Sequence, residues 1–359
     1  MSDAVSVDYD ILEEFVREVF EKLGIPEGDA SVCADVLISA DRRGISSHGV
    51  NRMKPFYYDR IRKGLQEPVT RVDVVREGPT TAVVDGGFGM GMVVARRSMQ
   101  MAIDKAGDYG TGMVVVRNST HYGIAGYYTK MAADSDMIGI SGTNARPSVA
   151  PTNGTEGMLG TNPLSFAFPT DEDFPFVLDC ATSITQRGKI EYLAREGKET
   201  PPGLVVGADG SIRTDTEGIL RDLPRDLAAF LPLGGDGESL GGHKGYGYST
   251  VVEVLSSALQ GAPFLKAVTG VNTGHFFMAV DISAFCDPAE FRRGAGDIMR
   301  ELRASRRKPG ADRIFTAGEK EYLFYERTRD RGVVLNESIR KDLITMRDEL
   351  GISGIDLGF

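Results

Sequence analysis

GMVVVRNSTHYG, residues 112–123, is the stretch that decides the fold class. Its first half is apolar and rich in valine, which is typical of a buried β-strand, and its second half is polar and ends in glycine. Apolar residues recur at helical spacing on both sides of it, so we expect amphipathic helices over residues 92–106 and 125–133. A buried strand between two helices is typical of an α/β fold, in which ligands usually bind where strands end.

The same alternation continues along the chain and extends the predicted sheet. Further strands are expected at residues 81–85, 137–143, 163–168, 176–178 and 276–282. Residues 195–243 are rich in Gly, Pro and Asp, which predicts loops and short strands. Helices are expected in two segments of the first 45 residues, with Asp29 capping the second, and over residues 52–63, 245–260, 288–307 and 336–350. Both ends of the chain are helical and charged in character, and we expect them to pack together.

A glycine cluster, Gly86-Gly87-Phe88-Gly89-Met90-Gly91, follows the strand predicted at residues 81–85. Its spacing differs from GxGxxG, and no acidic residue closes a strand about 20 positions further on, as the dinucleotide-binding fingerprint requires. We therefore expect a tight strand-to-helix turn here rather than a cradle for phosphate.

Composition narrows the classes of partner. The net charge of −10 would repel nucleic-acid phosphates, so no nucleic-acid partner is expected. Cys33, Cys180 and Cys286 are far apart and odd in number, which argues against a disulfide framework and favours a cytoplasmic location. The N-terminus lacks the apolar core of a signal peptide, and no run of about 20 apolar residues predicts a membrane span. The histidines lack metal-ligand spacing, so no metal site is expected.

The four histidines all lie beside glycine or polar turn residues, and His121 is the strongest candidate among them. It follows the central strand directly, and the polar residues 118–120 are placed to fix its tautomer. Histidine is the side chain best suited to act as a base near neutral pH. Arg52 lies four residues after His48, so the two would share a face if one helix began there, and its guanidinium offers a two-pronged grip on a carboxylate. A surface ion pair is the alternative interpretation of Arg52.

Six motifs, in one order along nearly the whole chain, resemble those of the malate/L-lactate dehydrogenase family, which is unrelated to the Rossmann enzymes. They are Asp41 to Gly49 (DRRGISSHG) with Arg52, Asn118 to Gly123 (NSTHYG), Gly160 to Leu164 (GTNPL), Asp179 to Ser183 (DCATS), Gly242 to Gly247 (GHKGYG) and Ala317 to Glu319 (AGE). The resemblance implies an α/β protein with a non-Rossmann, mixed-sheet nucleotide-binding domain, expected at residues 76–289. It also implies a helical substrate and dimer domain built from both chain ends, expected at residues 1–75 and 290–359.

The resemblance further implies an oxidoreductase that moves a hydride between NAD or NADP and a small 2-hydroxy or 2-keto acid, such as malate, oxaloacetate or a lactate-like acid. By this resemblance His121 is the catalytic base, and Ser47, His48 and Arg52 hold the substrate carboxylate. The residues expected to contact the cofactor are Thr143, Asn144, Ala145, Asp179, Cys180, Ala181, His243, Lys244, Gly318 and Glu319. The family also implies a homodimer.

Two alternatives remain open from the sequence. One is a reductase of cyclic imino acids, in which the proton goes to nitrogen. The other is a nucleotide-binding scaffold without catalysis, although such a scaffold has no need of both His121 and Arg52. Arg187 and Lys189 are candidates for holding the 2′-phosphate of NADP, but the choice between NAD and NADP stays open.

Overall fold

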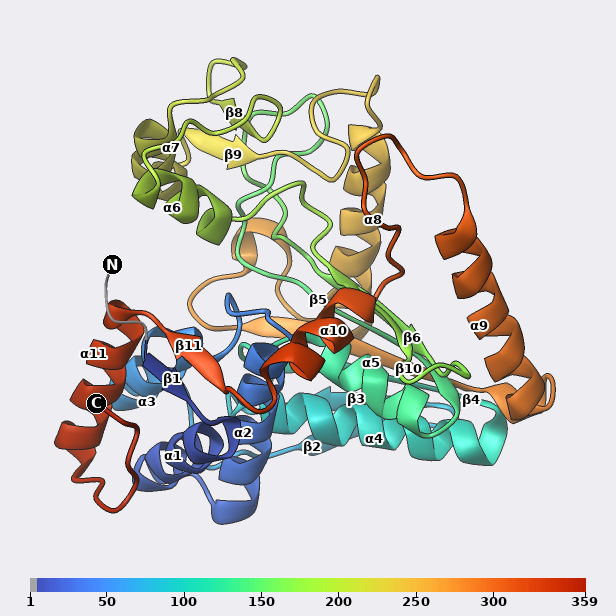
Figure 1. The fold of residues 1–359 in the computed structure, drawn as a ribbon. Helices are drawn as coiled ribbons and strands as arrows, with labels where there is room; N and C mark the ends of the chain where they lie inside the picture. Colours follow the sequence, from blue (N-terminus) through green and yellow to red (C-terminus); the bar gives the residue numbers. More distant parts are fainter. Residues whose placement is uncertain (1–4) are drawn as a thin grey trace.

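The computed structural model describes residues 5–359 and is built around a seven-stranded sheet in the order β2-β3-β4-β10-β5-β6-β7 (Figure 1). Only the β3–β4 pair of this sheet is parallel, and its other neighbouring strands are antiparallel. This confirms the predicted mixed sheet. The strands are β2 (Asp73–Glu77), β3 (Thr81–Asp85), β4 (Thr111–Ser119), β5 (Met137–Thr143), β6 (Leu164–Phe168), β7 (Phe176–Cys180) and β10 (Thr273–Asp281).

Helices cover both faces of the sheet because its central strands are apolar on both sides. On one face, α4 (Gly91–Tyr109) and α5 (Ala125–Asp134) bury Val114, Val116 and Phe277. On the other face, α8 (Gly242–Leu255) packs Val252 against Val115 and Phe276. The strand that decided the fold class is thus buried on both sides, as its run of valines predicts.

The two ends of the chain pack together, as expected. A short strand β1 (Val5–Val7) pairs antiparallel with β11 (Val333–Leu335). The helices α1 (Tyr9–Lys22), α2 (Glu27–Arg42) and α11 (Glu337–Leu350) share one apolar core, in which Phe15, Leu37 and Leu343 are fully buried.

The other C-terminal helices contact different parts of the molecule. Helix α9 (Pro288–Ala304) lies against the β6–β7 connection, where Arg300 pairs with Asp171 at 2.9 Å. Helix α10 (Glu319–Thr328) contacts α2. The domain boundaries given above stay a prediction.

Two local expectations were wrong. Asp29 does not cap the second helix, because α2 begins at Glu27 after Pro26, and the Asp29 carboxylate instead pairs with Arg97 at 2.6 Å. Residues 52–63 do not form one regular helix. They comprise the end of a 3₁₀ turn (Val50–Arg52), a π-helix (Met53–Tyr58) and a single α-helical turn, α3 (Asp59–Arg62).

Residues 184–233 form a small layer at the opposite end of the molecule from α1 and α3 (Figure 1). It holds α6 (Arg187–Arg195), α7 (Thr216–Asp222) and a two-stranded sheet of β8 (Val205–Gly207) and β9 (Ala228–Phe230). Ile190, Val205 and Phe230 lie in its own apolar cluster. The sequence predicted the short strands here but not the two helices.

The glycine cluster forms a strand-to-helix turn, as predicted. All six N–H groups of residues 86–91 donate to protein acceptors: Gly86 to Arg117 O, Gly87 to Asp85, Phe88 to Asn118 O, Gly89 to Gly86 O, Met90 to Thr70 and Gly91 to Thr120. A phosphate cradle needs free N–H groups, and this turn has none to offer. No helix among residues 5–359 is long and apolar enough to cross a membrane.

We predict that Leu343→Ala lowers the free energy of unfolding by about 2–5 kcal/mol, because it opens a cavity in the core shared by both chain ends. Urea unfolding followed by circular dichroism measures the change. Leu240, which is 78% exposed, provides the control, and Leu240→Ala should change stability by less than about 0.5 kcal/mol. Equal effects of the two substitutions would contradict the shared core.

Candidate functional site

The turn that carries His121 is fixed by the close approach of two backbones. Gly91, the first residue of α4, lies so near that a Cβ there would come within 2.2 Å of the Thr120 carbonyl oxygen. Gly91 N–H donates to the Thr120 hydroxyl, which in turn donates to the Gly89 carbonyl. The end of β4 and the start of α4 therefore hold the His121 backbone rigidly.

The His121 ring is oriented by Tyr57, which the sequence did not single out. The Tyr57 hydroxyl lies 2.6 Å from His121 Nδ1, the Gly123 N–H approaches the same nitrogen at 3.4 Å, and Nε2 has no hydrogen-bond partner among residues 5–359. The expectation that residues 118–120 fix the tautomer was wrong. Asn118 donates to Asp85, and the Thr120 hydroxyl bonds to Gly89 and Gly91 at the start of α4. Nε2 is the ring nitrogen left for a ligand.

The surroundings of His121 keep its ring uncharged. Burial lowers the pKa of His121 well below its usual value, and the nearby charges of His48, Arg60 and Arg52 lower it further. The rings of His48 and His121 are stacked with centroids 5.7 Å apart, and Phe56 lies 5.0 Å away. A neutral imidazole with one unpaired nitrogen can accept a proton from a bound hydroxyl group.

Ser47, His48 and Arg52 lie together beside His121. The Ser47 hydroxyl is 2.9 Å from His48 Nδ1, and Arg52 Nε donates to the Ser47 carbonyl at 2.6 Å. Burial and the charge of Arg52 lower the pKa of His48 to about 4, so this ring is neutral too. Arg52 forms no ion pair with any residue between 5 and 359, which removes the surface ion pair as an interpretation.

A buried carboxylate positions this turn. Asp41 is 3% exposed and accepts the Val50 N–H at 2.7 Å, and burial raises its pKa to about 7. Gly49 passes so close that a Cβ would lie 2.0 Å from Asp41 Oδ1. Asp41 and Gly49 thus fix the backbone that presents His48.

The segment Thr143, Asn144 and Ala145 continues from β5 into the protein interior. The Thr143 hydroxyl donates to the Gly274 carbonyl at 2.9 Å, Asn144 Oδ1 accepts the Gly274 N–H at 2.9 Å, and Ala145 N–H donates to Asn162. These side chains tie β5 to β10. The N–H groups of Asn144 and Ala145 are engaged as well, so a ligand contact from this segment would have to come mainly from its backbone carbonyl groups.

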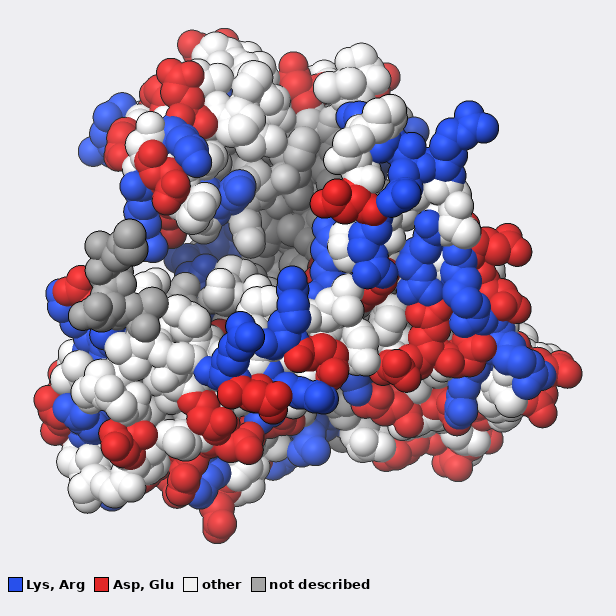
Figure 2. Space-filling view, in the orientation of Figure 1, with Lys and Arg blue, Asp and Glu red and all other residues white. Residues whose placement is uncertain are grey.

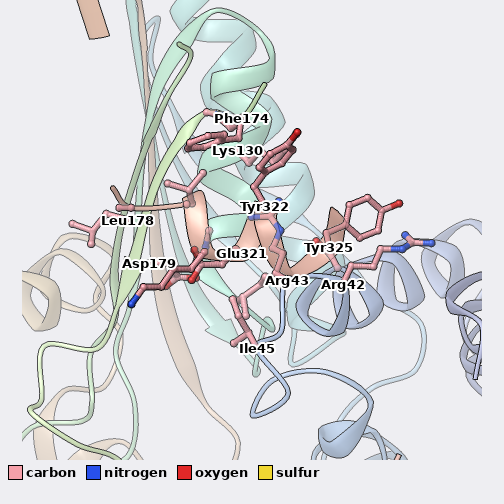
Figure 3. Close-up of a pocket in the computed structure, with 18 of the residues that line it drawn as sticks. Arg42, Arg43, Ile45, Lys130, Phe174, Leu178, Asp179, Glu321, Tyr322 and Tyr325 are labelled. Carbon is pink, nitrogen blue, oxygen red and sulfur yellow. The ribbon is translucent and has the colours of Figure 1, made fainter. Parts of the chain in front are cut away.

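Asp179 and Gly318 line a cavity of about 530 Å³ between β7, α5 and α10, shown in Figure 3. Asp179 accepts the N–H of Gly126 at 2.7 Å, and burial raises its pKa. Glu319 is buried and accepts hydrogen bonds from Thr316 and Arg313, so it holds its own loop in place.

The other expected cofactor residues lie around the opposite face of the sheet. Cys180 is exposed, and it points away from the Asp179 side because successive residues of a strand alternate between faces. Ala181 follows it as the strand ends. His243 and Lys244 are exposed in the first turn of α8, the helix on that face. The structure thus separates the expected cofactor residues into two groups.

Similar proteins identify the chain. The profile of a family described as malate/L-lactate dehydrogenase matches residues 7–344.

The chain belongs to the malate/L-lactate dehydrogenase family.

Relatives within this family are similar over nearly their whole length. Malate dehydrogenase from Pyrococcus horikoshii is 45% identical over 356 residues, which cover 98% of this chain and 97% of that protein. L-sulfolactate dehydrogenase from Methanothermobacter thermautotrophicus is 35% identical, with 95% and 96% covered. The crystal structure of malate dehydrogenase from Entamoeba histolytica superposes with a TM-score of 0.95 at 43% identity, covering 98% and 99%. The predicted enzyme class, a hydroxy-acid dehydrogenase, is confirmed, and the scaffold alternative falls away.

Sequence reasoning missed three residues of this dehydrogenase that lie at the site: Phe56, Tyr57 and Arg60. Phe56 and Tyr57 contact the His121 ring, and Arg60 acts on it through its charge. The spacing of Arg52, Phe56 and Arg60, four residues apart each time, was the signal that could have identified two of them. Among residues 5–359, no cluster of His, Cys, Asp and Glu could hold a metal ion.

We predict that Gly49→Ala lowers kcat/KM by about 10- to 100-fold, because the new methyl group displaces Asp41 and with it the His48 turn. Steady-state kinetics and a melting curve measure the effect. Gly28→Ala is the matched control. That glycine has open space around it in the first turn of α2, so alanine should leave activity intact and add about 0.5–1 kcal/mol of stability. Native kinetics for Gly49→Ala would show that Asp41 does not position the site.

Proposed function

We propose that this enzyme interconverts a small 2-hydroxy acid and its 2-keto acid, with malate and oxaloacetate as the preferred pair. The observation that carries the proposal is the half-buried His121 ring, whose Nε2 has no protein partner among the described residues, beside guanidinium groups that form no ion pair there. The names of the relatives support the substrate: two proteins 45% and 44% identical to this chain are malate dehydrogenases. A cyclic imino acid remains the weaker alternative, because the reductase of that class among the solved structures is 26% identical.

In the proposed mechanism, Arg52 binds the substrate carboxylate next to the reacting carbon, and its bond to the Ser47 carbonyl fixes the direction of the guanidinium. His121 Nε2 takes the proton of the substrate hydroxyl, and in the reverse direction it returns that proton to the keto oxygen. For Nε2 to act as the base, Nδ1 must carry the hydrogen of the neutral ring, so Nδ1–H donates to the Tyr57 hydroxyl oxygen both before and after proton transfer. When bound, the nicotinamide ring accepts or supplies the hydride.

The chain offers a place for the dinucleotide at the start of α8. The N-cap is Gly241, whose lack of a side chain leaves the first N–H groups of a 14-residue helix without a side-chain cap. The exposed Lys244 has no ion-pair partner among the described residues. Free N–H groups, the helix dipole and a cation together suit a diphosphate. Ala181 and the backbone of residues 143–145 are the proposed further contacts on this side.

Asp179, with Gly318 near it, is the proposed partner of a ribose hydroxyl from the other side of β7. The cofactor is NAD or NADP. Arg187, a candidate for binding a 2′-phosphate, is already paired with Glu191 at 2.8 Å, so it gives no reason to prefer NADP.

A homodimer completes the proposal. The outward side of α8 and the turn after it expose Tyr248, Val251, Val254 and Leu259, each about half accessible, at a spacing that forms one apolar stripe. A stripe of this kind on a long helix is typical of a subunit contact. Exposed free thiols at Cys180 and Cys286 fit a reducing compartment such as the cytoplasm.

We predict that His121→Ala lowers kcat for malate oxidation by about 100- to 10,000-fold, the usual contribution of a general base. The dissociation constant of NADH, measured by fluorescence, should stay within about threefold, since the ring is proposed to act on the substrate. Turnover is followed by nicotinamide absorbance. A near-native kcat would remove His121 from the role of base.

We also predict that Lys244→Ala weakens NADH binding by about three- to tenfold at low ionic strength, the order of an exposed charge contact. The loss should shrink as salt is added, because the charges are then screened. Fluorescence titration at two salt concentrations measures this. Lys341→Ala, which removes an exposed lysine of α11, is the control and should have no effect. If the two variants behave alike, the dinucleotide does not lie at the start of α8.

A further inference from the structure

A stack of two arginines and a phenylalanine runs along the irregular helical segment beside His121. The Arg52 guanidinium carbon lies 4.9 Å from the centre of the Phe56 ring, and that of Arg60 lies 4.4 Å from it. The π-helix at Met53–Tyr58 allows this arrangement, since its wider turns still keep residues four apart on one face. Phe56 therefore holds one guanidinium from the turn before it and one from the turn after it.

These cations have no carboxylate partner in the structure. Neither Arg52 nor Arg60 forms an ion pair among residues 5–359, although the chain contains 51 acidic residues against 41 basic ones. Both side chains are half-buried, and burial lowers the pKa of each, although at Arg52 the charge of Glu191, beyond ion-pair distance, opposes this effect. A charge that is partly removed from water and left unpaired is costly unless a ligand completes it.

A third arginine, on a different element, acts on Arg60 through its charge. Arg146, in the connection after β5, is close enough to Arg60 that its charge lowers the pKa of Arg60, after the larger effect of burial. Arg52 extends toward the first turn of α6, where its Nη2 lies 4.0 Å from where a Cβ of Gly188 would stand. Figure 2 shows the face hollowed between the part that carries α6 and α7 and the part that carries α10.

We propose that Arg60 binds a second anionic group of the substrate, so that the site selects acids that carry a negative charge at both ends. This inference rests on the proposed function, in which Arg52 takes the carboxylate beside the reacting carbon. One guanidinium satisfies one carboxylate, and a substrate with a single carboxylate would leave Arg60 unpaired. Arg146, the more exposed of the group, adds positive potential on the same side. A distal carboxylate or sulfonate would satisfy this chemistry equally.

The test compares two keto acids of equal length, oxaloacetate and 2-oxobutyrate, which differ by a carboxylate in place of a methyl group. Arg60→Gln should lower kcat/KM for oxaloacetate by roughly 10- to 150-fold, which is 1.5–3 kcal/mol for a charged hydrogen bond converted at 1.36 kcal/mol per decade. For 2-oxobutyrate the loss should be at least about tenfold smaller, because only the effect of the Arg60 charge on His121, which both substrates share, is removed there. Arg60→Lys keeps the charge without the planar fork, so its kcat/KM for oxaloacetate should lie between those of the wild type and Arg60→Gln.

Arg62→Gln is the matched control, because Arg62 lies two residues away over Tyr58 instead of Phe56. Arg62→Gln should leave kcat/KM unchanged for both keto acids. The inhibition constants of succinate and butyrate provide a second measurement, and Arg60→Gln should raise that of succinate tenfold or more while that of butyrate stays unchanged.

Equal losses of Arg60→Gln on both keto acids would overturn the inference and leave the proposed function standing, since Arg60 would then act only through His121 or the fold. No turnover of either acid by the wild-type enzyme would instead overturn the proposed function. In that case the effect of Arg60→Gln on succinate binding, measured by calorimetry, would still decide whether Arg60 is a second anion site.

Discussion

An uncharged imidazole held among guanidinium groups is the constraint on which the site depends. Burial and the charges of Arg52 and Arg60 both disfavour the imidazolium form of His121, so the ring is unprotonated and can accept a proton. The fold enforces this arrangement from three directions. The Gly91 contact fixes the histidine backbone, the Tyr57 hydroxyl fixes the ring, and the π-helix stacks the arginines on Phe56. A change in any one of these alters the proton affinity of Nε2.

The same electrostatics link substrate binding to proton transfer. An anionic substrate neutralises the guanidinium charges that disfavour imidazolium, so its arrival raises the pKa of His121. In the oxidation direction, the base then gains affinity for a proton when a hydroxyl group is there to supply it. In the reduction direction, the bound keto acid promotes the protonated ring that it needs as an acid. A substrate with two negative groups would do this more strongly than one with a single group.

The strands and the packing of the chain ends could be predicted because they follow from periodicity. Residues 137–143 were predicted to the residue, and the turn at residues 86–91 was identified from its glycine spacing. The position of His121 at a strand end and the spacing of His48 and Arg52, supported by the family motifs, led to three residues that the structure brings together. Tyr57 could not be found that way, because it reaches His121 from within a π-helix, whose period no apolar pattern indicated; Arg60 has only its spacing from Arg52 and Phe56 as a signal. The separation of Asp179 from Lys244 on opposite faces of the sheet likewise depends on strand register, which sequence spacing does not fix.

The most direct test of this account is the pKa of His121 itself, measured by NMR on protein with ring-labelled histidine. The chain has only four histidines, and the His121→Ala variant assigns the signal. The account predicts a pKa below the ordinary value of 6.5 in the free enzyme and a clear upward shift when succinate, a dianion without a hydroxyl group, is bound. A pKa at or above 6.5 in the free enzyme, or one that succinate leaves unchanged, would contradict it.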